Sequence, residues 1–275
     1  VKSSSACRTR IPQPIGGPGQ PATVQAARPF QPFGNITYYL YGESTNTNQL
    51  QLAARRRFSG LTFDLEYQYT KALGIDGPND ETVTNKLDIR HDYGNLDYYA
   101  RHALALNYSY NLPIGKGQWL LGNVGGALDR VVGGWKFSGV WKATSGTPFS
   151  VSFNSSLNGF PSGRADFLAG TPKYPAKKTY KQWFNASAFA VPANYTFGNS
   201  QRNMMYGPSF SEWDAALLKD LKITERVNFQ FRAEAFDVLN RTNFGGPAAN
   251  VSVPTTIGQI SSTSADNREL QFGGR

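Results

Sequence analysis

Side chains that could perform chemistry are few and scattered along this chain. Cys7 is the single cysteine, so neither an internal disulfide nor a cluster of thiolate metal ligands can form. His91 lies near Asp76, Asp88 and Asp92 in the sequence, but no motif joins these residues to a serine nucleophile. We therefore expect no catalytic residue, no metal ion and no cofactor, and we do not expect an enzyme.

Two short charged segments are candidates for binding ions. The first carries oxygen ligands that suit Ca²⁺, although their spacing does not match the EF-hand loop and acidic loops are common. The second carries ammonium groups that suit the phosphates of lipopolysaccharide, or that are simply solvated. The sequence leaves both choices open. The acidic set is Asp76, Asn79, Asp80 and Glu81, and the basic set is Lys173, Lys177, Lys178 and Lys181.

Aromatic side chains gather in one long polar segment of the chain. They could stack on a sugar or clasp a peptide, or they could pack against one another inside the loop. We take them as candidate ligand contacts of an extracellular loop. The set is Trp183, Phe184, Phe189, Tyr195, Phe197 and Tyr206.

Many of the remaining charges follow the two-residue period of a β-strand. From Val227 to Ala235, apolar residues alternate strictly with Asn, Gln, Arg and Glu, and the run that starts at Leu61 alternates in the same way. We predict strands from these runs and from others with the same pattern. The predicted strands are 48–58, 61–73, 98–112, 134–153, 210–223, 227–240 and 267–275.

The connections between these strands differ in length at their two ends. Tight turns at 59–60 and 224–226 alternate with long loops at 74–97, 154–208 and 241–265, and residues 1–47 form an irregular, extracellular segment. A glycine-rich connection before Trp135 has room for a short helix. Long loops of this kind are functional or disordered in compact domains.

The pattern favours strands that cross a membrane over strands of a soluble sandwich, although both alternate. Aromatic residues lie near the ends of the strands, and short turns face long loops, as in outer-membrane barrels. A closed barrel also pairs every backbone polar group in lipid. We predict an all-β, antiparallel transmembrane β-barrel segment of about seven strands, an incomplete barrel with long extracellular loops and short periplasmic turns. The alternative is a soluble or surface β-sandwich that binds carbohydrate.

In the barrel interpretation, the polar positions point into a wet lumen and the apolar positions face lipid. The charged lumen residues could contact a solute or a plug, or they could pair across neighbouring strands and hold the wall together. The lumen-facing candidates are Arg55, Arg57, Asp64, Glu66, Arg101, Lys136, Lys142, Asp214, Arg232 and Glu234.

Composition excludes other classes. The formal net charge is +9, but no dense stripe of Lys and Arg indicates nucleic-acid binding, and we expect no nucleic-acid partner. Only 17% of the residues are charged and 13% are aromatic, a balance that suits strands better than helices. The chain has no run of 18 consecutive apolar residues, so the sequence predicts no membrane-spanning helix.

Four ordered stretches resemble one family, the Oar-like TonB-dependent outer-membrane receptors and transporters, in the C-terminal part of their barrel. They are residues 48–73, 88–117 followed by 133–149, 183–210 and 213–247, which include "DYGNLDYYARHALALNYSYNLP" and "FQFRAEAFDVLNRTNFGGP". The barrels of such transporters have about 22 strands. The resemblance therefore implies an incomplete wall cut from a longer parent chain, in which the plug, the TonB box and a regulatory-like domain would lie.

The resemblance also implies a function and a location. Extracellular loops would bind a scarce solute, which is an oligosaccharide, a peptide or a siderophore, and the solute would pass through the barrel lumen. The location is the bacterial outer membrane. The expected partners are outer-membrane lipid and lipopolysaccharide, an unknown small solute, and the TonB complex through parts of the parent chain.

Overall fold

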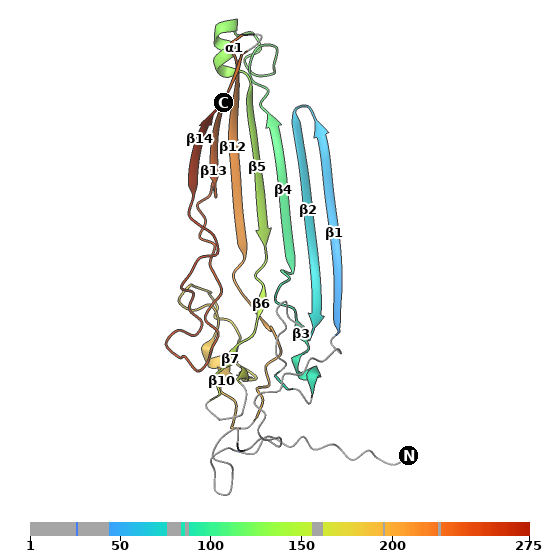
Figure 1. Ribbon diagram of the computed structural model, residues 1–275, viewed down its shortest axis with the longest axis vertical. Helices are drawn as coiled ribbons and strands as arrows, with labels where there is room; N and C mark the ends of the chain where they lie inside the picture. The colour runs from blue at the N-terminus through green and yellow to red at the C-terminus, as the bar shows by residue number, and fades with distance from the viewer. Residues whose placement is uncertain are drawn as a thin grey trace, which may run out of the picture.

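A computed structural model of the chain describes residue 26 and residues 44–75, 84–85, 88–155, 162–194, 196–224 and 227–275. Seven long strands form one antiparallel sheet in the order β1-β2-β4-β5-β12-β13-β14, and the short strand β3 (Gly94–Asn95) pairs with β2 (Figure 1). The long strands are β1 (Thr45–Phe58), β2 (Leu61–Gly74), β4 (His102–Asn111), β5 (Trp135–Thr144), β12 (Phe210–Lys222), β13 (Asn228–Phe236) and β14 (Glu269–Gly274). The predicted all-β, antiparallel fold class is confirmed.

The sheet is not closed into a barrel. Among the described residues, β1 and β14 are its two edges, because each pairs with only one neighbour. No second sheet covers the apolar side of this sheet in the part of the chain that the structure describes. The arrangement of a soluble sandwich, which needs two packed sheets, is therefore not found.

The tight turn between β1 and β2 follows directly from its two residues. Ser59 and Gly60 have φ values of 39° and 82°, and the flanking residues Phe58 and Leu61 are paired. Two positive φ angles give the turn a twist that matches the right-handed twist of the strands, and glycine adopts such an angle without strain. The predicted two-residue hairpin is confirmed.

Other strand boundaries differ from the prediction for local reasons. The predicted strand 134–153 ends at Thr144, because the chain passes so close to Gly207 at Gly146 that a side chain there would clash with the Gly207 carbonyl. The predicted strand 227–240 ends at Phe236, because the next residue, Asp237, has a φ of 46°. Residues 45–47, predicted to be irregular, belong to β1.

The connections sort to two ends of the molecule, as expected. At the tight-turn end lie the turn at 59–60, the turn that follows β12, and the segment 112–134 with helix α1 (Gly126–Val132) (Figure 1). The last segment is longer than the short turns expected at this end. No helix among the described residues is long and apolar enough to cross a membrane.

At the opposite end, the described residues of 75–101, 145–209 and 237–268 form a folded cap. Its elements are short, and six of its strands pair as three two-stranded sheets. The elements are η1 (Ile89–Asp92), β6 (Pro148–Phe149), β7 (Ser152–Phe153), β8 (Gly163–Arg164), β9 (Asp166–Phe167), η2 (Ala186–Ala188), β10 (Phe189–Ala190) and β11 (Met205–Tyr206).

Strand register gives the sheet two chemically different faces. Paired residues of an antiparallel ladder point to the same side, and alternate residues point to opposite sides. One continuous row joins Asp64, Asn107, Val140 and Asp214, and it belongs to what we call the polar face. The neighbouring row belongs to the apolar face and joins Leu65, Leu106, Trp141 and Trp213.

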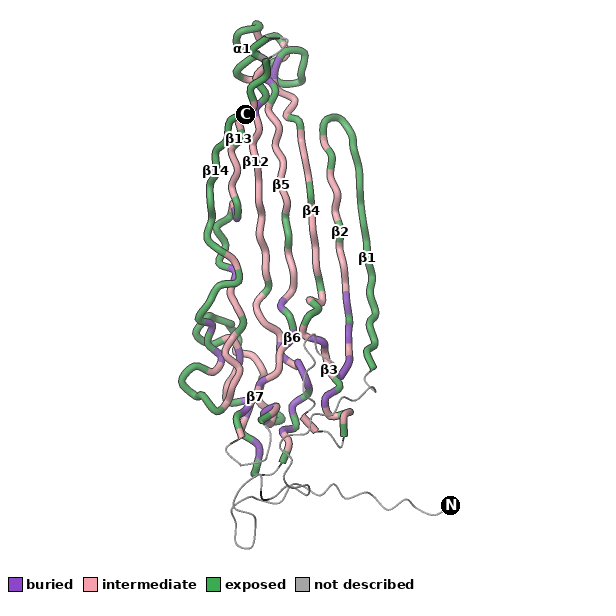
Figure 2. The backbone as a smooth tube through the Cα atoms, in the orientation of Figure 1, coloured by how far each residue is buried: buried purple, intermediate pink, exposed green. Residues whose placement is uncertain are grey.

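The buried core lies in the cap and not in the sheet. Figure 2 shows buried residues concentrated toward the cap, whereas most of the long strands are intermediate or exposed. The fully exposed β1 is the extreme case. The buried cluster is Val151, Ala165, Phe184, Ala188, Phe189 and Met205. A sheet without a core needs an apolar solvent on its apolar face, which is the situation in lipid.

Candidate functional site

The polar face carries charged side chains at its β1–β2 side. Arg55 lies opposite Asp64 in the register, and its Nε is 2.9 Å from the Asp64 Oδ2. A second nitrogen of Arg55, NH2, lies 2.9 Å from the Glu66 Oε1. The Arg55 side chain is 68% exposed, so water screens this cross-strand pair and it contributes little to stability.

A second group of charges lies on the other side of β4, on β5, β12 and β13. On β13, the Arg232 Nε is 2.9 Å from the Glu234 Oε1. Lys142 and Glu212 are directly opposite across β5 and β12. Glu212 was not among the predicted residues, although its spacing of two from Asp214 places it on the same face and would have identified it.

All but one of the predicted lumen-facing residues lie on the same face of the sheet. By parity in the register, nine of them lie on the polar face: Arg55, Arg57, Asp64, Glu66, Lys136, Lys142, Asp214, Arg232 and Glu234. Arg101 precedes β4 and contacts the cap instead. Its NH2 donates to the Tyr206 hydroxyl at 2.6 Å, and its guanidinium lies 5.1 Å from the centre of the Tyr206 ring.

The polar face encloses an open hollow of about 490 Å³. Its lining comes from β2, β4, β5, β12 and β13 and includes Asp64, Asn107, Ser138 and Arg232. Carboxylate, amide, hydroxyl and guanidinium groups therefore line the hollow together with apolar groups such as Val140, Ala216 and Phe236. Such a surface can exchange hydrogen bonds with a polar solute of either charge. Among the described residues, no group of three or more His, Cys, Asp or Glu side chains is placed to hold a metal ion.

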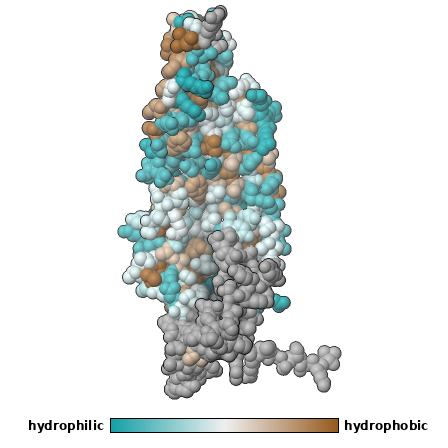
Figure 3. All heavy atoms as spheres, viewed as in Figure 1, coloured by the Kyte–Doolittle hydropathy of each residue, from teal (hydrophilic) through white to brown (hydrophobic). Residues whose placement is uncertain are grey.

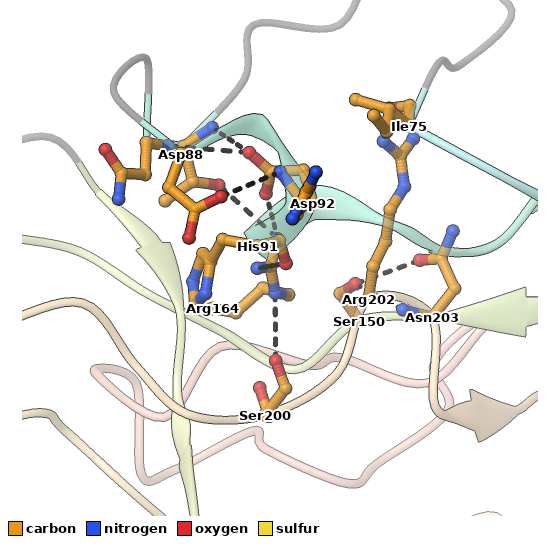
Figure 4. A network of polar contacts seen from close by, with 12 residues as sticks. Ile75, Asp88, His91, Asp92, Ser150, Arg164, Ser200, Arg202 and Asn203 are labelled. Atoms are coloured by element: carbon orange, nitrogen blue, oxygen red, sulfur yellow. Dashed lines mark hydrogen bonds and ion pairs between the residues drawn. The ribbon is translucent and has the colours of Figure 1, made fainter. Parts of the chain in front are cut away.

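A buried ion pair holds two parts of the cap together. The Arg164 NH1 contacts the Asp92 Oδ1, and these side chains are only 7% and 3% exposed (Figure 4). Arg164 also donates from NH2 to the His91 carbonyl at 2.6 Å and from Nε to the Ser200 carbonyl at 3.0 Å. The other Asp92 oxygen accepts the Thr84 backbone N–H at 2.7 Å. A single guanidinium thus ties three segments.

Neighbouring contacts attach the cap to the sheet. Arg202 donates to the carbonyl of Ile75, directly after β2. Asn203 donates to the Asn95 carbonyl at 2.7 Å, and Asn95 returns a hydrogen bond to the Asn203 carbonyl at 3.0 Å. The Ser150 hydroxyl donates to the Asn203 side-chain oxygen at 2.9 Å. These contacts fix the cap to the ends of β2 and β3.

The protonation of the cap follows from this burial. Burial acts to raise the pKa of Asp92, but the hydrogen bond and charge of Arg164 outweigh it and lower that pKa overall. Burial, together with the nearby Arg164 charge, lowers the pKa of His91. The Asp92 carboxylate contacts Arg164 and the Thr84 backbone N–H rather than the His91 ring.

The aromatic candidates divide into buried and half-buried residues. Phe184 and Phe189 are 0% and 6% exposed and pack edge to face in the cap core, with ring centres 5.8 Å apart. In this arrangement they cannot contact a solute, and their role is packing. Tyr195 lies outside the described residues. The acidic residues 76 and 79–81 lie outside them as well.

The other aromatic candidates border the core. The Trp183 indole donates to the Tyr206 carbonyl at 2.9 Å, and the Phe197 ring is tilted against the His91 ring, with centres 6.0 Å apart. The ammonium of Lys178, in the basic segment, lies 3.7 Å from the centre of the Tyr174 ring and 5.0 Å from that of Trp183. The ammonium of this exposed lysine therefore contacts aromatic rings of its own loop, and the neighbouring Lys177 is exposed as well.

Comparison with known proteins supplies one positive result. A family model described as "Outer membrane beta barrel domain" matches residues 6–271. No curated protein matches the chain, and no solved structure does.

Proposed function

Because this chain belongs to the outer membrane beta barrel domain family and resides in the bacterial outer membrane, we propose that it is part of the barrel of a TonB-dependent transporter similar to the Oar-like receptors. The observation that carries the proposal is the hollow on the polar face. A single sheet presents charged and amide groups to this hollow and apolar groups to the opposite side. That division suits a wall between acyl chains and a watery passage.

In this proposal the chain conducts a solute and does not transform it. The cap is built from the long connections expected to be extracellular, so it would be the first part to meet an incoming oligosaccharide, peptide or siderophore. Trp183, Phe197 and Tyr206 are half-buried and so remain the candidate aromatic contacts for this solute. Passage would then follow the charged rows of the polar face, and TonB would act through other parts of the parent chain.

Labelling of cysteines tests whether the polar face is wet. In a Cys7→Ser background, Ser138→Cys places a thiol on the lining of the hollow, and Phe137→Cys places one on the apolar face beside it. We expect a membrane-impermeant maleimide to label residue 138 and not residue 137 in outer-membrane vesicles. Equal labelling of both positions would contradict the division into a lumen face and a lipid face.

Uptake assays test transport itself. Cells that express the full protein would be given radiolabelled maltooligosaccharides, a peptide mixture and a ferric siderophore, with and without an uncoupler of the protonmotive force. We expect uptake of one class, lost with the uncoupler and reduced when a bulky maleimide is attached at residue 138. Uptake of all three classes would also be measured in cells from which the gene is deleted. If deletion changes none of them, the proposed transport is refuted, whereas the assignment to an outer-membrane barrel is unaffected.

A further inference from the structure

The segment 112–134 exposes large apolar side chains at the tight-turn end of the molecule. Trp119 is 85% exposed, and strongly hydrophobic residues gather at this end in Figure 3. A monomeric soluble surface rarely leaves so many apolar groups together. We call this group the apolar tip, and it consists of Trp119, Leu120, Leu121, Leu128 and Val131.

The apolar tip is an ordered structure. The Gly115 N–H donates to the Leu120 carbonyl at 2.9 Å, and the Leu120 N–H donates to the Pro113 carbonyl at 3.0 Å. The Asp129 side chain of α1 accepts the Lys116 N–H at 2.6 Å and so joins this turn to the helix. Because these bonds fix the turn, the outward direction of Trp119 is a property of the fold.

The segment is fastened to the apolar face of the sheet. Lys219 lies on that face, opposite Trp135 in the register, and its ammonium donates to the Gly133 carbonyl. The Trp135 indole donates to the Val131 carbonyl at 3.2 Å. Lys219 is only 5% exposed, because the end of α1 and the following glycines cover it. The apolar tip is therefore continuous with the surface that faces lipid.

We propose that the apolar tip inserts into the boundary between head groups and acyl chains in the periplasmic leaflet of the outer membrane. The tight-turn end of an outer-membrane barrel is its periplasmic end. Tryptophan favours this boundary, and Leu128 and Val131 lie three residues apart on one side of α1. Exposed Lys116 and Arg130 add positive charge beside phospholipid phosphates.

This inference depends on the outer-membrane barrel and not on the proposed transport of a solute. The partner is a phospholipid surface, because the tip continues the lipid-facing side of the wall. Docking of a periplasmic protein on the same residues is the competing outcome. The two are separated by asking whether lipid alone shields the tip.

Fluorescence quenching makes this test. The full protein, with Cys7→Ser, would carry an environment-sensitive nitrobenzoxadiazole label at Trp119→Cys or Leu128→Cys, with Ala176→Cys in the cap as the water-exposed control. It would be reconstituted in vesicles of phosphatidylethanolamine and phosphatidylglycerol with no other protein. Iodide on both sides of the vesicle, or nitroxide-labelled phospholipid, would serve as the quencher.

We expect labels at 119 and 128 to emit at shorter wavelength, to be quenched by nitroxide lipid and to resist iodide, and the label at 176 to show the reverse. Iodide quenching at 119 and 128 as strong as at 176 would overturn the proposal and indicate a site for a protein. The double substitution W119K/L121K should move the label at 128 from lipid quenching to iodide quenching. Continued lipid quenching at 128, with the strand circular-dichroism signal retained, would also contradict the proposal.

Discussion

At the scale of single residues, two ion pairs of similar chemistry have different energetic roles. Arg55 and Asp64 are bonded in the open, where water competes for both charges and removal of one partner costs little. Arg164 and Asp92 are bonded out of water, where loss of one partner leaves an uncompensated buried charge. The buried pair therefore decides whether the cap stays folded, and the exposed pair remains available to a solute.

Asp92→Asn should destabilise the cap by about 3–5 kcal/mol, because Arg164 would lose its counter-charge in a buried site. Hydrogen exchange of the cap amides measures this loss. The double substitution Asp92→Leu/Arg164→Met should recover part of the stability, since it buries no lone charge. As the matched control, Arg55→Met should leave stability nearly unchanged, because water screens this exposed pair. Equal effects of D92N and R55M would refute this difference.

The stability of the cap should fall with decreasing pH in two separate pH windows, an upper one set by His91 and a lower one set by Asp92. The lowered pKa of His91 means that the folded cap binds its proton less readily than the unfolded chain, so cap stability falls as the pH drops below about 6.5. The lowered pKa of Asp92 contributes stability that is present above about 3.8 and is lost at more acidic pH. Hydrogen exchange as a function of pH measures both windows. His91→Gln should remove the upper window only, and an unchanged profile would contradict this assignment.

Sequence reasoning could not find the buried pair, although it found most exposed charges. A two-residue alternation reveals which side of a strand a residue occupies, and this was sufficient for Glu66 or Arg232. Arg164 and Asp92 lie 72 positions apart in loops without periodicity. Only the folded cap brings them together, and the same holds for the burial of Phe184 and Phe189, whose residue type alone suited a ligand site equally well.

At the scale of elements, the alternation of the strands determines both faces of the wall. Leu106 lies in the middle of β4 on the apolar face, and Asn107 follows it on the polar face. Phe229 is also an apolar-face residue, but it lies near the end of β13. A substitution there would therefore not test contact with the centre of the membrane. The strand pattern predicted the seven strands and their faces, because strand geometry is local. It did not predict the short strands of the cap, whose two-residue pairs have no detectable period.

Leu106→Arg should cost about 2–4 kcal/mol, because it places a guanidinium in the hydrocarbon at mid-strand. Asn107→Arg, one residue further and on the polar face beside Asp64, should be tolerated. Chemical denaturation in detergent or lipid and the yield of assembled protein in the outer membrane measure both variants. Equal tolerance of L106R and N107R would argue against lipid contact on the apolar face.

On the apolar face, Gly139 of β5 leaves space for a side chain of a neighbouring strand, and we call this space the glycine notch. A Cβ at Gly139 would approach the Asp214 carbonyl to 2.4 Å and the Tyr108 hydroxyl to 2.5 Å. The Tyr108 ring uses this space, and its hydroxyl accepts a hydrogen bond from the Trp213 indole at 2.9 Å. Tyr108, Gly139 and Trp213 thus link β4, β5 and β12, an arrangement in which an aromatic side chain covers a strand glycine.

Gly139→Ala should destabilise the wall by about 1–3 kcal/mol, because the added methyl group has no space and displaces Tyr108 from its bond to Trp213. Gly246→Ala is the matched control, since a Cβ there meets nothing within 4 Å. Denaturation midpoints of the two variants measure the difference. A midpoint for G139A at or above that of G246A would contradict the role of the notch.

At the scale of the whole molecule, the wall and the cap depend on different surroundings. The wall leaves its apolar face to the membrane, whereas the cap buries its own apolar groups. Lipids with shorter acyl chains should therefore weaken protection from hydrogen exchange in the strands and leave protection in the cap nearly unchanged, because mismatch acts only on the spanning part. A parallel loss of protection in both parts would indicate that they form one cooperative unit.

The cap core has a further consequence. All of its members, including the half-buried Phe149, Trp183 and Val251, belong to connecting segments, and none belongs to the seven long strands. Its interior packing therefore places no demand on the strand sequences below it. A foreign set of connecting segments could therefore be grafted onto these strands without changing the strand sequences.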